Sequence, residues 1–238
     1  EIELCDWSSD VCSSDLSYVA FLEALGADST ICAISGTGYI WSDKVRNRIA
    51  GGEIAEAGFD NSLNFEKLVA LKPDVVFLYG LTGKNAVTDK LHELGLKTVY
   101  IGDYVENNPL GRAEWITVFG EFTGRRELAS TLFDSISNEY NRAKALVSGV
   151  EKRPEVMLNA PWQDSWFVPG DRSYMVRLLE DAGGNYACRG VDSDQSRPIS
   201  TETAFVAASQ SDFWLSPGTA TSLAELNAMN PRFGSIPP

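Results

Sequence analysis

Short apolar runs alternate with amphipathic segments along most of the chain. This pattern predicts strands over 29–34, 75–79 and 98–101 and helices over 17–26, 64–71 and 84–94. The run 75–79 is apolar at every position, which indicates a strand covered on both faces, as in a parallel sheet. Asn64 is expected to cap the helix that begins after it. The alternation of strand and helix predicts βα units in an open α/β sheet.

A different pattern occupies the middle of the chain. Over 126–148 the apolar positions recur mostly at steps of three and four residues, which predicts one long amphipathic helix. At about 1.5 Å per residue this helix spans roughly 35 Å. Its length and central position suggest a rigid strut between two lobes.

The alternation restarts after this helix. Strands are predicted over 155–159 and 212–215, and helices over 173–182 and 201–209. We therefore predict an N-terminal α/β lobe over 17–125, a linking helix over 126–150 and a C-terminal α/β lobe over 151–238. The fold class is α/β, with two Rossmann-like lobes of mainly parallel sheets bridged by one long α-helix.

The first sixteen residues do not fit this scheme. They contain the tripeptide SSD twice and show no helical or strand period. The stretch 5–16 resembles, residue for residue, one reading frame of a common sequencing-adapter oligonucleotide. We predict that residues 1–16 are a non-native tail, and that any signal peptide or lipid-bearing cysteine lies upstream of it.

Composition and charge narrow the function. The 238 residues carry a formal charge of −13 without a basic stripe, which argues against nucleic-acid binding. No apolar run is long enough for a membrane-spanning helix. His92 is the single histidine, so a histidine-built metal site is disfavoured. There is no CxxC pair, and Cys32 and Cys188 are expected to be buried structural thiols.

Aromatic residues follow the predicted strands in both halves. In open α/β sheets, ligands bind beyond the carboxyl ends of the strands. Aromatic side chains at such ends in both lobes therefore predict a shared ligand cleft. The candidates are Tyr39 and Trp41 in a glycine-flanked loop, Tyr79 at the end of a strand, and Trp162 and Trp166 in the loop 161–170.

One glutamate occupies the first turn of a predicted helix in each half. Glu66 follows Asn64, and Glu202 follows Ser200. The helix dipole alone favours a carboxylate at this position, so the pattern by itself does not assign a function.

These residues together resemble a known family, the substrate-binding proteins of ABC importers for vitamin B12 and ferric siderophores. The resemblance covers 17–238. It rests on NFEKLVALKPDVV over 64–76, AFLEALG over 20–26, LGLKTV over 94–99, PG at 169–170, LLEDAGG over 178–184 and ISTE over 199–202.

The resemblance implies a binding protein that captures an iron–siderophore or cobalamin-type metal chelate between two lobes. It implies delivery to an ABC permease and ATPase complex in the inner membrane, with Glu66 and Glu202 docking to the permease. The protein would be periplasmic and monomeric, with lipid anchoring left open. The resemblance also implies that a first strand precedes residue 17 and that the second lobe is incomplete, so that the chain is truncated at both ends.

The predicted ligand contacts combine aromatic and cationic groups. Flat or apolar parts of the chelate suit the aromatic side chains. Arg172, Arg189 and Arg197 each suit an anionic chelate, and the predicted set includes Arg197. Neither a metal ion held by the protein alone nor a cofactor is expected.

Two alternatives stay open at this point. One is an α/β enzyme that binds a nucleotide or sugar in the cleft, for which His92 would be the available base. The other is a receptor for bare zinc or manganese, which the single histidine disfavours.

Overall fold

The computed structural model describes the chain as two compact units. The first comprises 1–105 and 113–135, and the second comprises 106–112 and 136–238. The residues whose structure is described are 11–13, 16–59, 62–80, 86–162, 165–190, 192–215 and 222–229.

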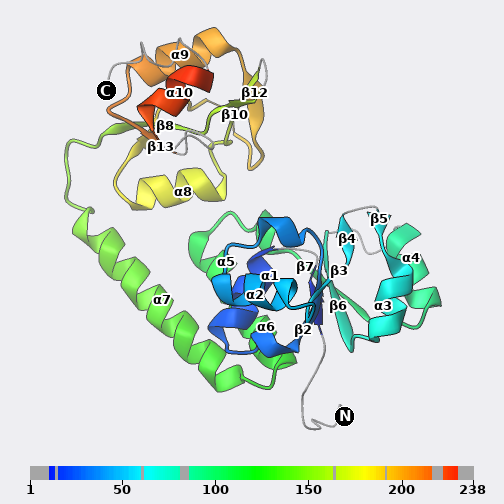
Figure 1. Ribbon diagram of the computed structural model, residues 1–238. Coiled ribbons are helices and arrows are strands. Elements are labelled where there is room, and N and C mark those ends of the chain that lie inside the picture. The colour runs from blue at the N-terminus through cyan, green and yellow to red at the C-terminus, as the bar shows by residue number, and fades with distance from the viewer. Residues whose placement is uncertain are drawn as a thin grey trace. The chain divides into compact units, whose positions relative to one another are not determined.

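The first unit contains a parallel sheet with helices on both faces (Figure 1). Its strands are β1 (Val11–Ser13), β2 (Ile31–Ile34), β3 (Ala55–Glu56), β4 (Gly58–Phe59), β5 (Ser62–Leu63), β6 (Val75–Tyr79) and β7 (Thr98–Ile101). Its helices are α1 (Leu16–Ala24), α2 (Asp43–Ala50), α3 (Phe65–Leu71), α4 (Ala86–Glu93) and α6 (Ile116–Phe122), with short 3-10 turns η1 (Asp28–Thr30), η2 (Thr37–Tyr39) and η3 (Asp103–Val105). Helix α5 (Pro109–Glu114) crosses the division between the units.

The sheet of the first unit has the strand order β3-β2-β1-β6-β7, and every pairing in it is parallel. The carboxyl ends of its strands therefore lie along one edge. A two-stranded antiparallel ribbon, β4 and β5, leads into α3.

The central strand β1 lies in the stretch 6–16, whose sequence shows no helical or strand period. Val11–Ser13 pairs with β2 on one side and with β6 on the other. The backbone groups of three residues are enough to complete hydrogen-bonded ladders on both sides, whatever their side-chain pattern. The non-native origin of residues 1–16 stays a prediction.

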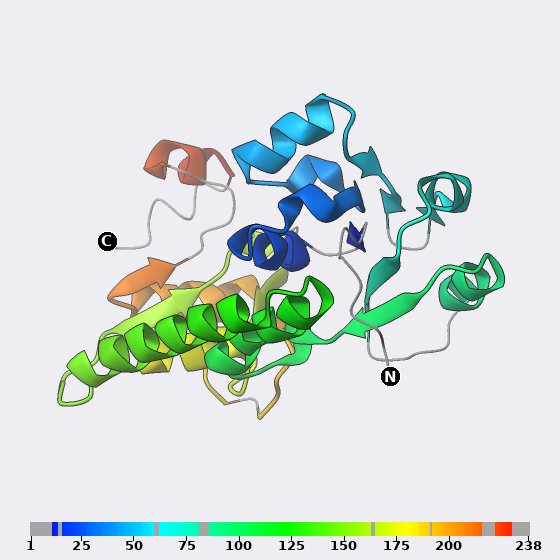
Figure 2. The same ribbon diagram turned by 90° about the horizontal axis from the view of Figure 1, so that it is seen from below.

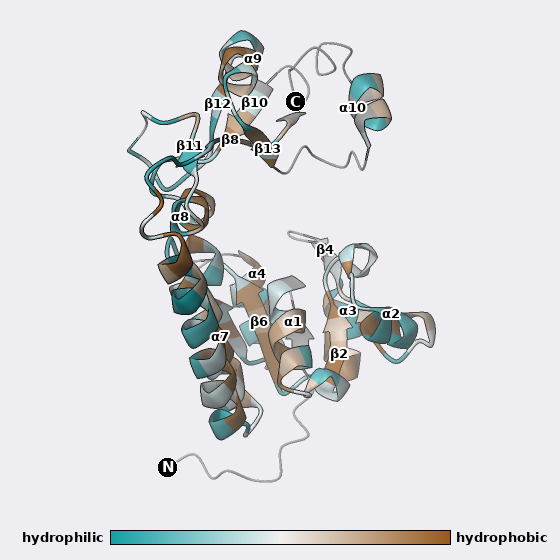
Figure 3. Cartoon of the chain, turned by 90° about the vertical axis from the view of Figure 1, so that its left-hand side faces the viewer, coloured by the Kyte–Doolittle hydropathy of each residue, from teal (hydrophilic) through white to brown (hydrophobic). Residues whose placement is uncertain are grey.

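Strand β6 confirms the prediction of an apolar strand covered on both faces. Val75 and Phe77 belong to one core cluster, with side chains from α1, α2 and α6. Val76 and Leu78 belong to another, with side chains from α3 and α4. Figure 1 shows these two groups of helices on opposite sides of the sheet, and Figure 3 shows hydrophobic strands between more polar helices.

The second unit contains two small sheets instead of one large sheet. Its strands are β8 (Glu155–Leu158), β9 (Pro161–Trp162), β10 (Ser165–Val168), β11 (Asn185–Tyr186), β12 (Arg197–Ile199) and β13 (Phe213–Leu215). Its helices are α8 (Tyr174–Asp181), α9 (Thr201–Ser209) and α10 (Leu223–Met229). Strand β8 pairs in parallel with β11 and β13, whereas β10 pairs antiparallel with β9 and β12.

The pair β9 and β10 corrects the prediction that 161–170 is a loop. Trp162 lies opposite Ser165, and Pro161 lies opposite Trp166, so the segment turns back on itself. The segment contains three aromatic residues and Val168, and such residues suit strand pairing once a partner strand is available.

Helix α7 (Arg126–Leu146) confirms the predicted long helix and runs without interruption from the first unit into the second, as Figure 2 shows. In the second unit it is held by one carboxylate. The Tyr140 hydroxyl donates to Asp181 at 2.7 Å, and Lys144 Nζ lies 2.8 Å from the same carboxylate. Burial alone would raise the pKa of Asp181, but these two partners and the charge of Arg177 outweigh it and lower that pKa.

Most predicted elements match the structure to within a few residues. Strands β6 and β7 have the predicted bounds, and Asn64 caps α3 by accepting from the Lys67 amide at 3.0 Å. Helices α2, α5, α6 and α10 were not predicted. The fold class is confirmed as α/β with mainly parallel pairings, while the predicted domain limits stay a prediction.

Candidate functional site

The candidate site begins at the carboxyl edge of the sheet in the first unit. Strands β2, β6 and β7 end there with Ile34, Tyr79 and Ile101, and the short 3-10 turns η2 and η3 follow β2 and β7. Since neighbouring strands lie about 4.8 Å apart, the ends of β2 and β6 are about 10 Å apart across β1. This spacing is on the scale of one flat organic ligand.

Tyr39 and Trp41 lie in the segment that follows β2. Gly36 has φ of +78°, a conformation that other residues adopt only at a cost, and it turns the chain into η2. The Tyr39 side chain is 63% exposed and that of Trp41 is 89% exposed. Singly exposed apolar groups are normal on a protein surface, whereas exposed apolar groups that gather at one place mark a candidate binding site.

Tyr79 ends β6 and stacks on a second tyrosine that the sequence analysis did not select. Tyr104 lies in η3, directly after β7, and its ring centroid is 4.1 Å from that of Tyr79 at an interplanar angle of 34°. Tyr79 is still 54% exposed. The pair forms an aromatic surface over two adjacent strand ends. The one sequence signal for Tyr104 is that this residue follows the predicted strand 98–101.

Trp166 is not part of an exposed site. It is 0% exposed in the core of the second unit, where its ring packs on Trp214 at 5.4 Å between centroids. Its indole N–H donates to the carbonyl of Leu158 at 3.2 Å. The prediction that Trp166 contacts a ligand is therefore wrong, because the β9–β10 pairing places this side chain toward the core. The side chain of Trp162 lies outside the described residues.

The three candidate arginines differ in their surroundings. Arg172 pairs with Asp192 at 2.6 Å, and Arg189 pairs with Glu180. Arg197 lies half-buried in β12, and its Nε is buried without a hydrogen-bond partner among the described residues. Of the three arginines, Arg197 has a buried N–H group, at Nε, that a ligand with a hydrogen-bond acceptor would satisfy.

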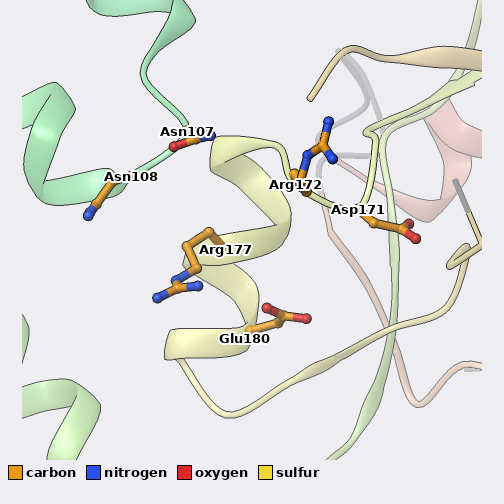
Figure 4. Close-up of a pocket in the computed structure, with 6 residues that line it drawn as sticks. All are labelled: Asn107, Asn108, Asp171, Arg172, Arg177 and Glu180. Atoms are coloured by element: carbon orange, nitrogen blue, oxygen red, sulfur yellow. The ribbon is translucent and has the colours of Figure 1, made fainter. Parts of the chain in front are cut away.

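A polar pocket of about 270 Å³ lies within the second unit (Figure 4). It is lined by Asn107, Asn108, Asp171, Arg172, Arg177 and Glu180. In Figure 4 Arg177 and Glu180 extend from different sides of α8. Arg172, Arg177 and Glu180 at this pocket each pair with a side chain of opposite charge. Asp171 accepts from the Gly190 amide at 2.9 Å, and its other oxygen is buried without a hydrogen-bond partner among the described residues.

Glu66 and Glu202 lie where the sequence predicted them. Glu66 is exposed in the first turn of α3, and Glu202 is exposed in the first turn of α9. Each helix has a side-chain cap, since Asn64 accepts from Lys67 and the Ser200 hydroxyl accepts from the Thr203 amide at 3.1 Å. Both carboxylates are thus held on short, capped helices, one in each unit.

The described part of the chain contains neither a cluster of metal ligands nor a candidate membrane span. There, no three side chains of histidine, cysteine, aspartate or glutamate gather as metal ligands. Within the same residues, no helix combines the length and apolar character that crossing a membrane requires.

The histidine lies at the other edge of the sheet. His92 Nε2 is 2.7 Å from the hydroxyl of Thr98, which is the first residue of β7. Tyr104 follows the carboxyl end of the same strand. The only histidine of the chain is therefore separated from the aromatic edge by the length of β7.

Two α/β units joined by a continuous helix, with exposed aromatic groups at strand ends, define a two-lobed ligand-binding protein. The model of the periplasmic binding protein family matches residues 11–237. The chain belongs to this family. The matched region includes β1, which agrees with the place of that strand in the sheet.

The chain is also similar to a curated archaeal protein. The chain is 27% identical over 224 residues to the uncharacterized lipoprotein MJ0878 of Methanocaldococcus jannaschii. The match covers 90% of this chain and 53% of that protein. The chain thus spans about half the length of this relative.

Solved structures share the fold at low identity. The heme-binding protein HutB of Vibrio cholerae has a TM-score of 0.75 at 17% identity, covering 97% of this chain and 86% of that one. The siderophore-binding protein FhuD of Vibrio cholerae, bound to Fe3+-Desferal, has a TM-score of 0.69 at 15% identity, with 97% and 88% covered. An ABC transporter substrate-binding protein of Listeria monocytogenes EGD-e has a TM-score of 0.67 at 18% identity, with 94% and 81% covered.

Proposed function

We propose that this protein is the substrate-binding component of an ABC importer and that it captures a metal chelate, either an iron–siderophore or a cobalamin-type ligand. Heme belongs to the same class of flat metal chelates and is included in the test below. In this proposal the chain holds the chelate through organic groups, and the metal is cargo.

The observation that carries the proposal is the aromatic edge of the first unit, defined as Tyr39, Trp41, Tyr79 and Tyr104. These side chains follow three strands of one parallel sheet, and the first three are more than half exposed. Aromatic faces contribute large contact areas with few rotatable bonds, which suits flat or apolar parts of a chelate. Similarity of fold to proteins whose names record heme and siderophore binding adds to this argument.

The proposal includes contacts from the second unit. Trp162 and Arg197 remain candidates there, Arg197 because its buried Nε would gain an acceptor from an anionic ligand. Trp166 is excluded by its burial.

Glu66 and Glu202 are proposed to dock the protein onto the permease. Each carboxylate is exposed in the first turn of a helix. A cationic group of the permease could therefore reach it without unfolding of the lobe. The fold similarity to an ABC transporter substrate-binding protein supports such a partner. An ATPase would complete the importer in the inner membrane.

We further propose that the protein works as a monomer outside the cytoplasm. The family assignment and the lipoprotein relative support this location. Lipid anchoring is left open within the proposal.

A binding role without catalysis is the simplest account of the site. His92 contacts Thr98 at the edge of the sheet opposite to the aromatic edge. An enzyme of the nucleotide- or sugar-binding type would need another general base close to the ligand. We therefore keep the enzyme reading as the alternative that the first experiment tests.

The first experiment is a tryptophan-fluorescence titration with hemin, ferric desferrioxamine B and cyanocobalamin. The iron-free forms, protoporphyrin IX and desferrioxamine B, serve as controls, and free N-acetyltryptophanamide corrects for absorption by the ligand. Saturable quenching by one metal chelate supports the proposal. Failure of every probe to bind would contradict metal-chelate transport and favour the enzyme reading.

Two variants locate the ligand that binds. Trp41→Ala and Tyr79→Ala should each weaken binding about tenfold, which corresponds to about 1.4 kcal/mol of contact energy. Phe213→Ala is the matched control, since Phe213 is an aromatic residue of 59% exposure at the amino end of β13. Equal losses in all three variants would contradict a specific role for the aromatic edge.

A separate experiment tests docking. The double variant Glu66→Ala with Glu202→Ala should bind the ligand with unchanged Kd and fail to support uptake by the reconstituted importer. Glu127→Ala is the control, because Glu127 is an exposed acidic residue in the first turn of α7. Weaker ligand binding by the double variant, or normal uptake, would overturn the docking role.

A further inference from the structure

One carboxylate organises the turn that carries Tyr39 and Trp41. Glu56, the last residue of β3, accepts four hydrogen bonds, two on each oxygen. Oε1 accepts from the amides of Gly36 at 3.0 Å and Gly58 at 3.1 Å. Oε2 accepts from the amide of Thr37 at 2.8 Å and from its hydroxyl at 2.6 Å.

These donors need an acceptor from outside the turn. The first amides of a helical turn have no partner within it, and Gly36 and Thr37 are the residues that open η2. The left-handed conformation of Gly36 aims the successive amides of Gly36 and Thr37 at one carboxylate. An anion suits this arrangement better than a neutral acceptor.

The protonation state of Glu56 agrees with this role. Partial burial would raise the pKa of its carboxyl group, but the four hydrogen bonds outweigh burial and lower that pKa. The carboxylate is therefore ionised throughout the neutral range.

The backbone around Glu56 is fixed from the other side as well. The Glu56 carbonyl accepts from Lys67 Nζ at 3.2 Å. The Ala57 amide donates to Ile34 at 2.8 Å, and the Ala57 carbonyl accepts from the Asn64 amide at 2.8 Å. The segment is thus tied both to β2 and to the capping residue of α3.

Gly58 completes this connection. Its φ is +95°, and a Cβ added there would lie 2.4 Å from the carbonyl oxygen of Ser62. Only glycine fits, so the chain leaves Glu56 in one defined direction.

We propose that Glu56 is a positioning residue for ligand binding, whose carboxylate holds η2 so that Tyr39 and Trp41 are presented in one conformation at the aromatic edge. This inference rests on the proposed function. Glu56 itself does not contact the ligand in this scheme. Its contribution is to remove the conformational freedom that the turn would otherwise lose on binding.

The test compares Glu56→Gln with Glu53→Gln. Glutamine keeps the size of Glu56 but offers one acceptor oxygen and sets an NH₂ group against donor amides. Glu53→Gln makes the same chemical change three residues earlier, at a carboxylate that pairs with Arg48 at 2.9 Å and is 62% exposed. Guanidinium unfolding of each variant shows that both remain folded.

The first readout is hydrogen exchange of single amides, measured without ligand. In Glu56→Gln the amides of Gly36 and Thr37 should exchange at least about tenfold faster, while those of β6 stay protected. In Glu53→Gln both sets should match the wild type. Unchanged exchange at Gly36 and Thr37 in Glu56→Gln would overturn the positioning role.

The second readout is the Kd for whichever of hemin, ferric desferrioxamine B or cyanocobalamin the wild type binds. Glu56→Gln should bind about tenfold more weakly, and Glu53→Gln as tightly as the wild type. A wild-type Kd in Glu56→Gln overturns the inference and leaves the proposed function standing. Absence of binding by the wild type itself contradicts the proposed function, while the exchange readout still decides whether Glu56 orders the turn.

Discussion

The two units have the same sequence pattern, in which strands alternate with helices and aromatic residues lie near strand ends, but they form different sheets from it. In the first, β6 lies inside a five-stranded parallel sheet, so its two faces are buried and only its end, Tyr79, reaches solvent. In the second, the strands are divided between two three-stranded sheets, and the aromatic segment after β8 folds back as β9 and β10. Trp166 is buried there.

An aromatic residue near the end of a strand is therefore exposed or buried according to the strands that pair around it, not according to its type. Tyr39 and Trp41 follow β2 through the turn η2, Tyr79 is the last residue of β6, and all three stay exposed. Trp166 lies in β10, which pairs antiparallel with β9 and β12, and alternate residues of this strand face the core.

The largest expected effect separates the two tryptophans that the sequence treated alike. Trp166→Ala should lower the free energy of unfolding by about 3–5 kcal/mol, because a large buried ring and its hydrogen bond are lost. Trp41→Ala, at a side chain that is 89% exposed, should change it by less than about 0.5 kcal/mol.

Guanidinium unfolding followed by circular dichroism measures both values. Amide exchange then assigns the loss, which should fall on β8 and not on β6. Equal destabilisation by the two substitutions would refute the distinction between a core and a surface role.

The next effect concerns the helix that runs through both units. Asp181→Asn should cost about 2 kcal/mol of unfolding free energy, because it removes the carboxylate that Lys144 and Tyr140 contact in a largely buried position. The control is Asp192→Asn, whose pair with Arg172 is exposed at both partners and should be worth at most about 1 kcal/mol. If both variants lose the same free energy, burial of the Asp181 network has no special weight.

The same network makes a prediction about pH. The pKa of Asp181 in the folded protein is lower than its ordinary value of 3.8, so its stabilising effect is present above that value. The effect is lost as the pH falls through the lowered, folded pKa. The stability difference between wild type and Asp181→Asn should therefore be constant from pH 7 to 5 and should shrink below about pH 4. A difference that stays constant from pH 5 down to pH 2.5 would contradict this sign.

The smallest expected effect concerns the stacked tyrosines. If Tyr104 supports Tyr79, a double-mutant cycle of Tyr79→Ala and Tyr104→Ala should give a coupling of about 1 kcal/mol in ligand binding. The equivalent cycle of Phe213→Ala with Tyr104→Ala pairs residues of separate units and should give no coupling. Additive losses for the tyrosine pair would mean that each ring meets the ligand independently.

Local signals allowed much of the fold to be predicted. The apolar run 75–79 and the cap at Asn64 depend on neighbouring residues alone, and the structure has both. The long helix also follows from its own period. The aromatic edge was predicted in part, since Tyr39, Trp41 and Tyr79 stand out in loops or at a strand end.

Other features depend on residues far apart in the chain. Tyr104 stacks on Tyr79, which lies 25 positions earlier in the chain. Glu56 accepts hydrogen bonds from the amides of residues 36 and 37. Neither contact could be predicted from a sequence pattern, because the residues of each pair come together only when the strands of the sheet assemble.

The sequence by itself determined the alternation of strand and helix, the family and the buried strand at the centre of the first unit, because each rests on local periodicity or contiguous motifs. The tertiary structure decided the rest. Residues 11–13 became the central strand because two neighbouring ladders offered backbone partners, despite the absence of any periodic pattern. Trp166 became core because an antiparallel partner set the face of its strand, and the packing of whole elements, not the residue type, fixed its exposure.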